Sequence, residues 1–150
     1  MNVQDEIKAL KQRIAELEEQ VEQEEEFPQK YDDYWYVDDD TEVLSQKWHN
    51  SEYDEGRLSI DNIFKTKEQA DFAVEKLKVE AELRKFGRPF ILGEENWYLN
   101  MIRSKDITIA YDHYNIHQGT VYFKSKDKVK EVIEIIGEER IKKYLFGVEE

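Results

Sequence analysis

The sequence predicts an α+β protein in which an N-terminal coiled-coil helix precedes two tandem βββα units. Three observations support this class: a heptad repeat of apolar residues at the start, an internal repeat in the remainder, and short aromatic segments that precede helix-capping residues. We expect the two units to pair into one antiparallel sheet with helices on one face. The predicted coiled coil covers residues 1–27 and the body 31–150, with repeats at about 31–88 and 89–150.

The first predicted element is a coiled-coil helix, because its apolar residues are separated by alternating steps of four and three. β-Branched residues at heptad position a and leucine at d favour a parallel dimer, in which Glu6 would face Lys11 of a second copy. The segment from Arg13 to Glu18 also resembles a pattern of short trimeric coiled coils, so a trimer stays open. Docking of the helix on its own body is the competing interpretation. The predicted oligomerisation residues are Val3, Ile7, Leu10, Ile14, Leu17 and Val21.

The body contains an internal repeat with a period of about 60 residues. Residues 64–77 align without a gap to residues 123–136, and upstream residues 35–38 parallel residues 97–100. A repeat of this length indicates a duplicated supersecondary unit. Chance similarity between two strand-to-helix junctions is the alternative explanation.

Each repeat is expected to contain a hairpin, a third strand that ends at Phe64 or Phe123, and a helix. Thr66 and Ser125 are predicted N-caps, because their hydroxyls accept hydrogen bonds from amides of the first helical turn. The first helix should end near Phe86, before a glycine and a proline. Its apolar spacing predicts burial of Ala70, Ala73, Val74, Leu77 and Ala81. The second helix is expected to bury Val129, Val132, Ile133 and Ile136.

The chain has a formal net charge of −13, of which −12 lies in residues 1–66. Such a charge repels nucleic acid, so we expect no direct nucleic-acid binding and predict a protein partner with a basic or nucleic-acid-binding surface. Acidity that only maintains solubility is the competing explanation. The absence of cysteine and of a long apolar segment predicts a cytoplasmic protein without membrane contact.

The sequence shows no recognisable catalytic pattern, and we expect neither enzyme activity nor a cofactor. His113 and His117 have a metal-ligand spacing for a helix, but the segment reads as a strand end and a loop. The acidic run 38–40 lacks the glycine and glutamate of a calcium loop and reads as a hairpin turn. We therefore predict no metal site.

Acidic and aromatic residues of the first repeat form the candidate partner surface, where its loop is longer than that of the second repeat. Such side chains can bind an arginine-rich surface by stacking and charge-assisted hydrogen bonds. A solvated loop with Trp48 folded inward is the other interpretation. The predicted partner-binding residues are Asp38, Asp39, Asp40, Trp48, Glu52, Tyr53, Asp54 and Glu55. The alternative is a groove between repeats or protomers for a nucleotide second messenger, formed by Trp97, Tyr98, Arg103 and Tyr111.

Residues 62–70, 75–79 and 137–150 resemble segments of small proteins encoded by phages and prophages of Gram-positive bacteria. In that group a similar Phe-Lys-Thr-Lys-Glu-x-Ala junction follows a short coiled coil. The resemblance covers about residues 31–150 and brings no catalytic residue. It implies an accessory protein in the host cytoplasm, of a kind that often inhibits host machinery, including defence systems. A non-enzymatic anti-defence inhibitor is the leading hypothesis; a nucleotide sponge and a virion assembly or structural protein are the alternatives.

Overall fold

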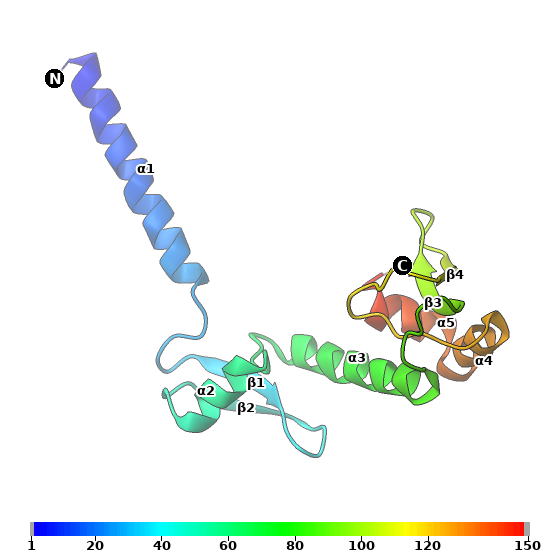
Figure 1. The fold of residues 1–150 in the computed structure, drawn as a ribbon. Coiled ribbons are helices and arrows are strands. Elements are labelled where there is room, and N and C mark those ends of the chain that lie inside the picture. Colours follow the sequence, from blue (N-terminus) through cyan, green and yellow to red (C-terminus); the bar gives the residue numbers. More distant parts are fainter. Residues whose placement is uncertain (1, 149–150) are drawn as a thin grey trace. The chain divides into compact units, whose positions relative to one another are not determined.

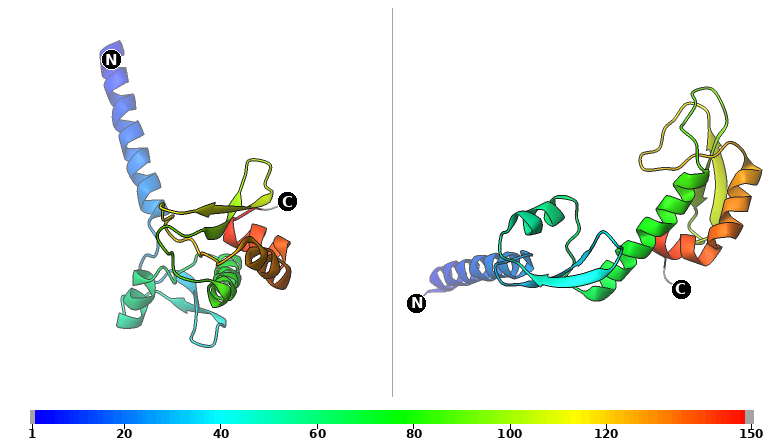
Figure 2. Two further views of the ribbon diagram at one scale, coloured as in Figure 1. Left: turned by 45° about the vertical axis from the view of Figure 1, so that its right-hand side comes forward. Right: turned by 90° about the horizontal axis from the view of Figure 1, so that it is seen from below.

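The computed structural model describes residues 2–148, with the side chains of residues 23–25 left out. The chain divides into two compact units, Met1–Ala70 and Asp71–Glu150, and the division falls inside helix α3 (Figures 1 and 2). The mixed α+β class is confirmed. The expected single sheet is wrong, because the strands form two separate antiparallel pairs, β1–β2 and β3–β4. Among the described residues, no helix is both long and apolar enough to cross a membrane.

Helix α1 (Val3–Glu25) is the first element of the first unit. Its N-terminus is capped by Asn2, whose side-chain oxygen accepts a hydrogen bond from the amide of Asp5 at 2.9 Å. Strong helix formers occupy most positions, and the first turn carries acidic residues that suit the positive end of the helix dipole. The helix ends just before Phe27-Pro28, since proline cannot continue it. A helix within the predicted range 1–27 is therefore confirmed, and its pairing in a coiled coil stays a prediction.

The hairpin of the first unit consists of β1 (Asp33–Val37) and β2 (Val43–Lys47), which pair antiparallel. Asp38 organises the connecting turn, because its Oδ1 accepts from the amides of Asp40 and Glu42 at 2.9 and 2.8 Å. A short helix, α2 (Glu52–Ser59), follows in the segment that we expected to be a loop. The extra length of the first repeat is thus an additional structured element.

The two predicted third strands are reduced to isolated bridges, at Phe64 in the first unit and at Tyr122 and Phe123 in the second. Phe64 exchanges two backbone hydrogen bonds with Trp35 (2.8 and 2.9 Å), and Phe123 does the same with Trp97 (3.1 and 2.8 Å). The strands stay short because a helix begins three residues after each phenylalanine. The βββα description is therefore too regular. The sequence alignment nevertheless paired these tryptophans and these phenylalanines, and they occupy equivalent places in the two units.

Helix α3 (Lys67–Phe86) begins with the predicted capping box and ends at the predicted residue. The amide of Gln69 donates to Thr66 Oγ1 at 3.2 Å, and the Gln69 side chain accepts from the amide of Thr66 at 3.4 Å. Burial differs from the expectation in the second half of the helix. Leu77 and Ala81 are exposed, whereas Val79 and Leu83 are buried in the core of the second unit. The buried stripe therefore shifts along the helix, which a single amphipathic pattern could not predict.

The second unit contains a hairpin of β3 (Asn96–Met101) and β4 (Ile107–Asp112) and the helix α4 (Lys126–Ile136). Ser125 caps α4 as predicted, since its hydroxyl accepts from the amide of Lys128 at 3.1 Å. The short helix α5 (Glu138–Arg140) and the π-helical turn η1 (Ile141–Leu145) follow. The fully buried core of this unit consists of Val79, Leu83, Leu99, Phe123, Val129, Val132, Ile136 and Ile141.

Gly87 ends α3 where two segments of the second unit approach each other closely. A Cβ atom at this position would lie 2.5 Å from Val121 Cγ1 and 3.1 Å from the carbonyl oxygen of Tyr122. We therefore expect Gly87→Ala to lower the free energy of unfolding by about 1–3 kcal/mol, because overpacking forces neighbours to move. Urea unfolding measures this change.

The matched control for this prediction is Gly56→Ala in α2, where a new Cβ meets nothing within 4 Å. This substitution should leave the free energy of unfolding unchanged or raise it by up to ~1 kcal/mol, because alanine has a higher helix propensity than glycine. Equal stabilities of Gly87→Ala and the unaltered chain would contradict the close packing at Gly87.

Candidate functional site

The apolar stripe of α1 is uncovered. All six predicted oligomerisation residues are exposed, with between 43% and 68% of their surface accessible. Ile14, Leu17 and Val21 line an open, mainly apolar patch on the helix surface together with Glu18 and Glu22. Exposed apolar residues are individually unremarkable, but a continuous two-per-heptad row is the pattern of a coiled-coil seam. None of the described residues covers this row.

Charged residues flank the seam of α1 at the positions that face a second helix in a coiled coil. Glu6 and Arg13 occupy heptad position g, and Lys11 and Glu18 occupy position e. Arg13 makes a 3.4 Å ion pair with Glu16 in its own helix, and both side chains are at least half exposed. Such an exposed pair contributes little stability, so the guanidinium remains available to a second chain.

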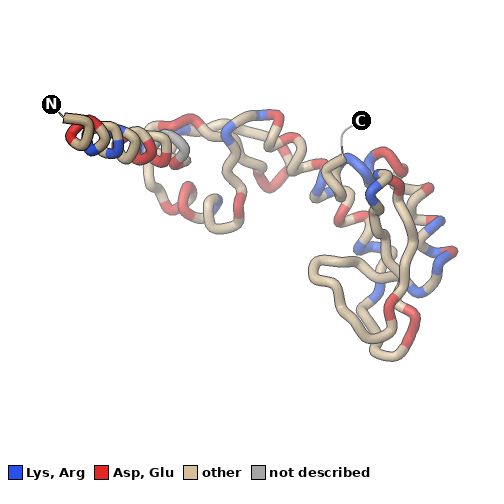
Figure 3. Tube along the Cα trace, turned by 90° about the horizontal axis from the view of Figure 1, so that it is seen from above, with Lys and Arg blue, Asp and Glu red and all other residues tan. Residues whose placement is uncertain are grey.

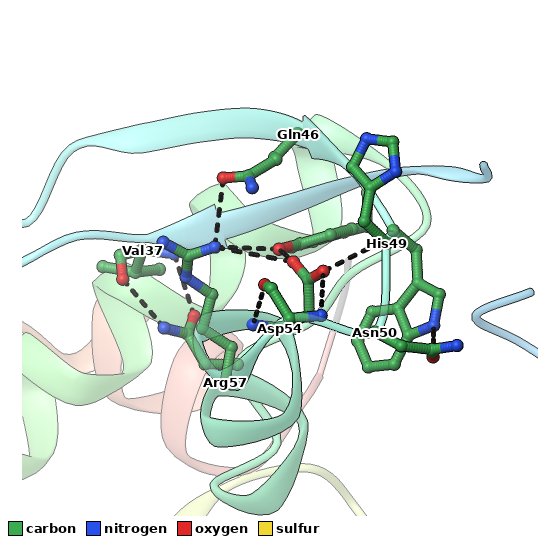
Figure 4. A network of polar contacts seen from close by, with 10 residues as sticks. Val37, Gln46, His49, Asn50, Asp54 and Arg57 are labelled. Carbon is green, nitrogen blue, oxygen red and sulfur yellow. Dashed lines mark hydrogen bonds and ion pairs between the residues drawn. The ribbon is translucent and has the colours of Figure 1, made fainter. Parts of the chain in front are cut away.

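Asp54 is the centre of a buried polar network in the first unit (Figure 4). Its side chain is fully buried. The carboxylate accepts a hydrogen bond from the hydroxyl of Tyr34, and further bonds from the amides of His49 (2.9 Å) and Ser51 (3.1 Å). The Ser51 hydroxyl in turn accepts from the amide of Asp54 at 3.1 Å, which completes a capping box. This carboxylate therefore fixes the start of α2 to the hairpin.

Arg57 extends this network to the surface of β1 and β2. Its Nη1 donates to Tyr34 Oη at 2.8 Å and to Gln46 Oε1 at 3.2 Å. The guanidinium lies 3.7 Å from the ring centroid of Tyr36, a cation–π contact, and 3.9 Å from Asp54 Oδ1. Among the described residues, no buried side-chain nitrogen or oxygen lacks a hydrogen-bond partner, which is the arrangement of a rigid structural lock.

Burial alone would raise the pKa of the Asp54 carboxyl, but its hydrogen bonds to Tyr34, His49 and Ser51 outweigh burial and lower the pKa to about 2. Burial and the bond to Asp54 raise the pKa of the Tyr34 hydroxyl. The pair therefore stays as carboxylate and neutral phenol at neutral pH. The lowered pKa therefore results from the hydrogen bonds that Asp54 makes in the folded protein. Because the carboxylate is fully buried, it is not accessible to a substrate as a base.

The structure divides the predicted partner-binding residues into two groups. Trp48 and Asp54 are buried, and Asp38 is held in the hairpin turn. Trp48 folds inward and its Nε1 donates to Asn50, so the interpretation with an inward tryptophan describes this residue correctly. Trp48 and Asp54 therefore cannot contact a partner while the unit is folded. The exposed members of the set are Asp39, Asp40, Glu52, Tyr53 and Glu55. Aspartate and glutamate positions are coloured red along the chain in Figure 3.

The residues proposed for nucleotide binding do not converge. Trp97 packs on Tyr111 across the strand pair, with ring centroids 4.7 Å apart. Tyr98, the next residue in β3, faces the other side and packs on His117 at 4.9 Å. Arg103 lies in the exposed turn between β3 and β4. One ligand could not contact all four side chains within the second unit.

The histidines of the second unit belong to an aromatic and hydrogen-bonded surface. His117 Nε2 lies 2.7 Å from Asp112 Oδ2, and the ring of His113 packs edge-on against Tyr111 at 5.4 Å. In residues 2–148, no group of three or more histidine, aspartate or glutamate side chains could hold a metal ion. His113 and His117 lie in a segment without helical structure, so their spacing of four residues does not place them on one helix face.

Asn96 is a buried polar residue that the sequence analysis did not single out. Its side-chain nitrogen, which carries two hydrogens, lies within hydrogen-bond distance of the carbonyl oxygens of Ile91, Glu94 and Asp112, at 2.9, 3.0 and 3.0 Å. Its side-chain oxygen accepts from the backbone amide of Ile91 and from Arg88, at 2.8 and 2.9 Å. These contacts anchor the loop before β3. In the sequence, Asn96 is distinguished only by its position directly before an aromatic strand. This arrangement is too common to predict a buried asparagine.

The candidate site thus has two parts. The first is the uncovered seam of α1, and the second is the set of exposed acidic residues of the first unit, where the Asp54 network holds α2 in place. Comparisons with protein-family models, curated proteins and solved structures found no match to this chain.

Proposed function

We propose that the chain is a non-enzymatic binding protein that dimerises through α1 and presents the acidic surface of its first unit to a basic protein. The observation that carries this proposal is the exposure of all six seam residues of α1. A helix of three heptads is marginally stable alone in water, and covering its apolar seam with a second copy supplies the missing stabilisation.

A parallel dimer fits the seam best. Ile7, Ile14 and Val21 occupy position a and leucine occupies the two inner d positions, a combination that favours two strands. Parallel pairing also places Glu6 beside Lys11 of the second copy and Arg13 beside Glu18. Both contacts join opposite charges, so the same register satisfies the apolar and the charged positions.

The exposed acids support a basic protein as the partner. The first 66 residues carry a net charge of −12, and Glu52, Tyr53 and Glu55 are exposed on α2, which the Asp54 network holds in place. Fixed carboxylates beside a tyrosine can bind guanidinium groups by charge and stacking. Dimerisation would double this surface and raise its avidity.

The resemblance to phage proteins extends the proposal to a biological setting. An acidic, dimeric accessory protein of a phage could block the nucleic-acid-binding surface of a host protein, such as a defence nuclease, by imitating its ligand. This setting rests on the sequence resemblance alone. We do not extend the proposal to nucleotide sequestration, because the aromatic residues suggested for it lie on opposite faces of the β3–β4 hairpin.

The double substitution Glu52→Lys/Glu55→Lys should weaken binding of an arginine-rich peptide by at least about tenfold, because it reverses two charges on the proposed surface. Fluorescence anisotropy with a labelled peptide at low and physiological salt measures the affinity. The matched control is Glu131→Lys/Glu134→Lys, which makes the same change in net charge on exposed positions of α4.

We expect the control to weaken binding by no more than about twofold at physiological salt, where charges beyond a Debye length of ~8 Å are screened. Equal losses in the two double variants would show that net charge alone attracts the peptide, and would contradict a binding surface on α2.

A further inference from the structure

The outer edge of β4 carries a row of outward-facing backbone groups. β3 pairs with β4 on one side, and on its other side Trp97 and Phe123 exchange two backbone hydrogen bonds of 3.1 and 2.8 Å. The N–H and C=O of Trp97 therefore point away from β4. In an antiparallel pair, hydrogen-bonded and non-hydrogen-bonded residue pairs alternate. Because Trp97 and Tyr111 form a non-hydrogen-bonded pair, the N–H and C=O of Tyr111 point away from β3.

The same alternation applies to Ile109 and Ile107. They lie opposite Leu99 and Met101, in the next two non-hydrogen-bonded pairs of the hairpin. Each of the three β4 residues thus directs one N–H and one C=O outward. Within residues 2–148, no backbone hydrogen bond from another segment uses these groups. The outer edge of β4 is therefore open to a further strand.

β4 also lacks the features that usually protect a strand edge, which are lysine, proline and bulges. Residues 107–111 read Ile-Thr-Ile-Ala-Tyr, without charge or proline, in a chain of which 38% is charged. Their register with β3 is uninterrupted, so no bulge twists the edge away. The edge strand of the first unit differs, because β2 carries Lys47 and four of its five residues are exposed.

The side chains of β4 give its two faces different characters. Ile107 and Ile109 are half-buried and pack against the core of the second unit, and Tyr111 on the same face is 49% exposed. Thr108 and Ala110 lie on the opposite face, because side chains alternate along a strand. A strand with alternating apolar and polar residues would therefore continue both faces.

A carboxylate at each end of the row selects between possible occupants. Asp106 is exposed, and the Asp112 side chain, beside His117, is 24% exposed. A second copy paired antiparallel through all three outward-facing residues would place Asp106 opposite Asp112 at both ends. Like charges directly opposite each other destabilise a sheet, whereas a basic residue at each end of the added strand would be favourable.

We propose that β4 binds an extended segment of another protein as an additional antiparallel strand, in which apolar residues alternate with polar ones and a basic residue stands at each end. Antiparallel pairing lets each outward-facing residue exchange two hydrogen bonds with its partner. In such strand addition the backbone bonds supply affinity and the alternate side chains supply specificity. The site lies wholly in the second unit, so it stands or falls separately from the seam of α1 and the acids of the first unit.

The capped peptide Lys-Val-Thr-Val-Thr-Val-Lys, titrated into the full-length, ¹⁵N-labelled protein, tests the site. In the proposed register its valines lie opposite Tyr111, Ile109 and Ile107, and its lysines lie opposite Asp112 and Asp106. We expect saturable changes in the amide signals of the three β4 residues. The same peptide with glutamate in place of both lysines should bind at least about tenfold more weakly. The absence of saturable changes, or equal binding of the two peptides, would overturn the proposal.

Methylation of single peptide nitrogens separates strand addition from non-specific adsorption. A methyl group on the nitrogen of the central valine removes the N–H that would donate to the C=O of Ile109, and should weaken binding at least about tenfold. The matched control carries the methyl group on the next threonine, whose N–H points away from β4 in this register, and should bind within about threefold of the parent peptide. Equal affinities of the two methylated peptides would refute antiparallel pairing with this edge.

Two variants of the protein locate the binding. Asp106→Lys should weaken binding of the lysine-flanked peptide at least about fivefold, because it places like charges opposite each other. Glu134→Lys makes the same change in net charge at an exposed position of α4 and should leave the affinity within about twofold. Equal affinities of the two variants would contradict the proposed register. Amide signals of Ile109 that shift with protein concentration before any peptide is added would assign the edge to a second copy and reject the peptide.

Discussion

Ile14→Asp is expected to dissociate the protein into single chains and to unfold most of α1. The substitution places a carboxylate at an a position in the middle of the seam, where each copy would bury it against an apolar surface without a partner. The 23 residues of α1 would then lose their covering and, as a short isolated helix, most of their helicity. Size-exclusion chromatography with light scattering measures the first effect and circular dichroism at 222 nm the second.

Gln12→Asp is the matched control for this prediction. It introduces the same carboxylate in the same helix at heptad position f, which points away from the seam. We expect this variant to keep the mass of the unaltered protein and nearly all of its ellipticity. An Ile14→Asp protein with unchanged mass and helicity would show that the apolar row serves some purpose other than self-association.

Asp54→Ala is expected to lower the free energy of unfolding of the first unit by about 3–4 kcal/mol. The change leaves the Tyr34 hydroxyl and the amides of His49 and Ser51 buried without their acceptor, and each unsatisfied group costs about 1–3 kcal/mol. It also removes the carboxylate beside Arg57. Urea unfolding followed by tryptophan fluorescence measures the loss.

The neighbouring substitution Glu55→Ala is the control, because Glu55 is exposed in the same helix turn. It should change the free energy of unfolding by no more than about 0.5 kcal/mol. A loss below ~1 kcal/mol in Asp54→Ala, or equal losses in the two variants, would contradict the role of Asp54 as the lock between α2 and the hairpin.

Asp54 also gives the first unit a defined pH dependence. Its folded-state pKa of about 2 lies below the ordinary value of 3.8, so the ionised form is favoured by folding. The resulting stabilisation, roughly 2 kcal/mol, is fully present above the unfolded-state pKa and is lost as the pH falls from 3.8 through about 2. Urea unfolding between pH 5 and 2 should therefore show a loss in the unaltered chain that Asp54→Ala lacks.

Regular, local features were predictable from the sequence. The helix α1, the N-caps Thr66 and Ser125 and the end of α3 follow from spacing and capping chemistry that act within a few residues. The equivalence of the two tryptophan–phenylalanine pairs follows from the internal repeat. The repeat alignment was informative because each tryptophan pairs with the phenylalanine of its own unit.

Features that depend on long-range packing were not predictable. The two hairpins form separate sheets. The third strands shrink to isolated bridges, because nearby helix starts leave no room for longer pairing. The helix α2 was missed although Ser51 and Asp54 have the spacing of a capping box. Acidic residues in a loop-like composition suggested a solvated surface, and only the three-dimensional contacts show that Asp54 is the buried one.

The candidate site was predictable in part, for the same reason. The seam of α1 is a property of one helix, and the structure leaves its six residues exposed. The Asp54 network, in contrast, joins residues that are about 20 positions apart in the sequence, since the Tyr34 hydroxyl of β1 contacts both Asp54 and Arg57 of α2. No local pattern in the sequence brings these residues together.

Sedimentation equilibrium of the intact protein over a wide concentration range tests self-association most directly. The covered seam requires a species of two 18.1 kDa chains that persists at low micromolar concentration. A single 18.1 kDa species at every concentration would mean that the row from Val3 to Val21 finds no second copy, and the dimer would have to be abandoned.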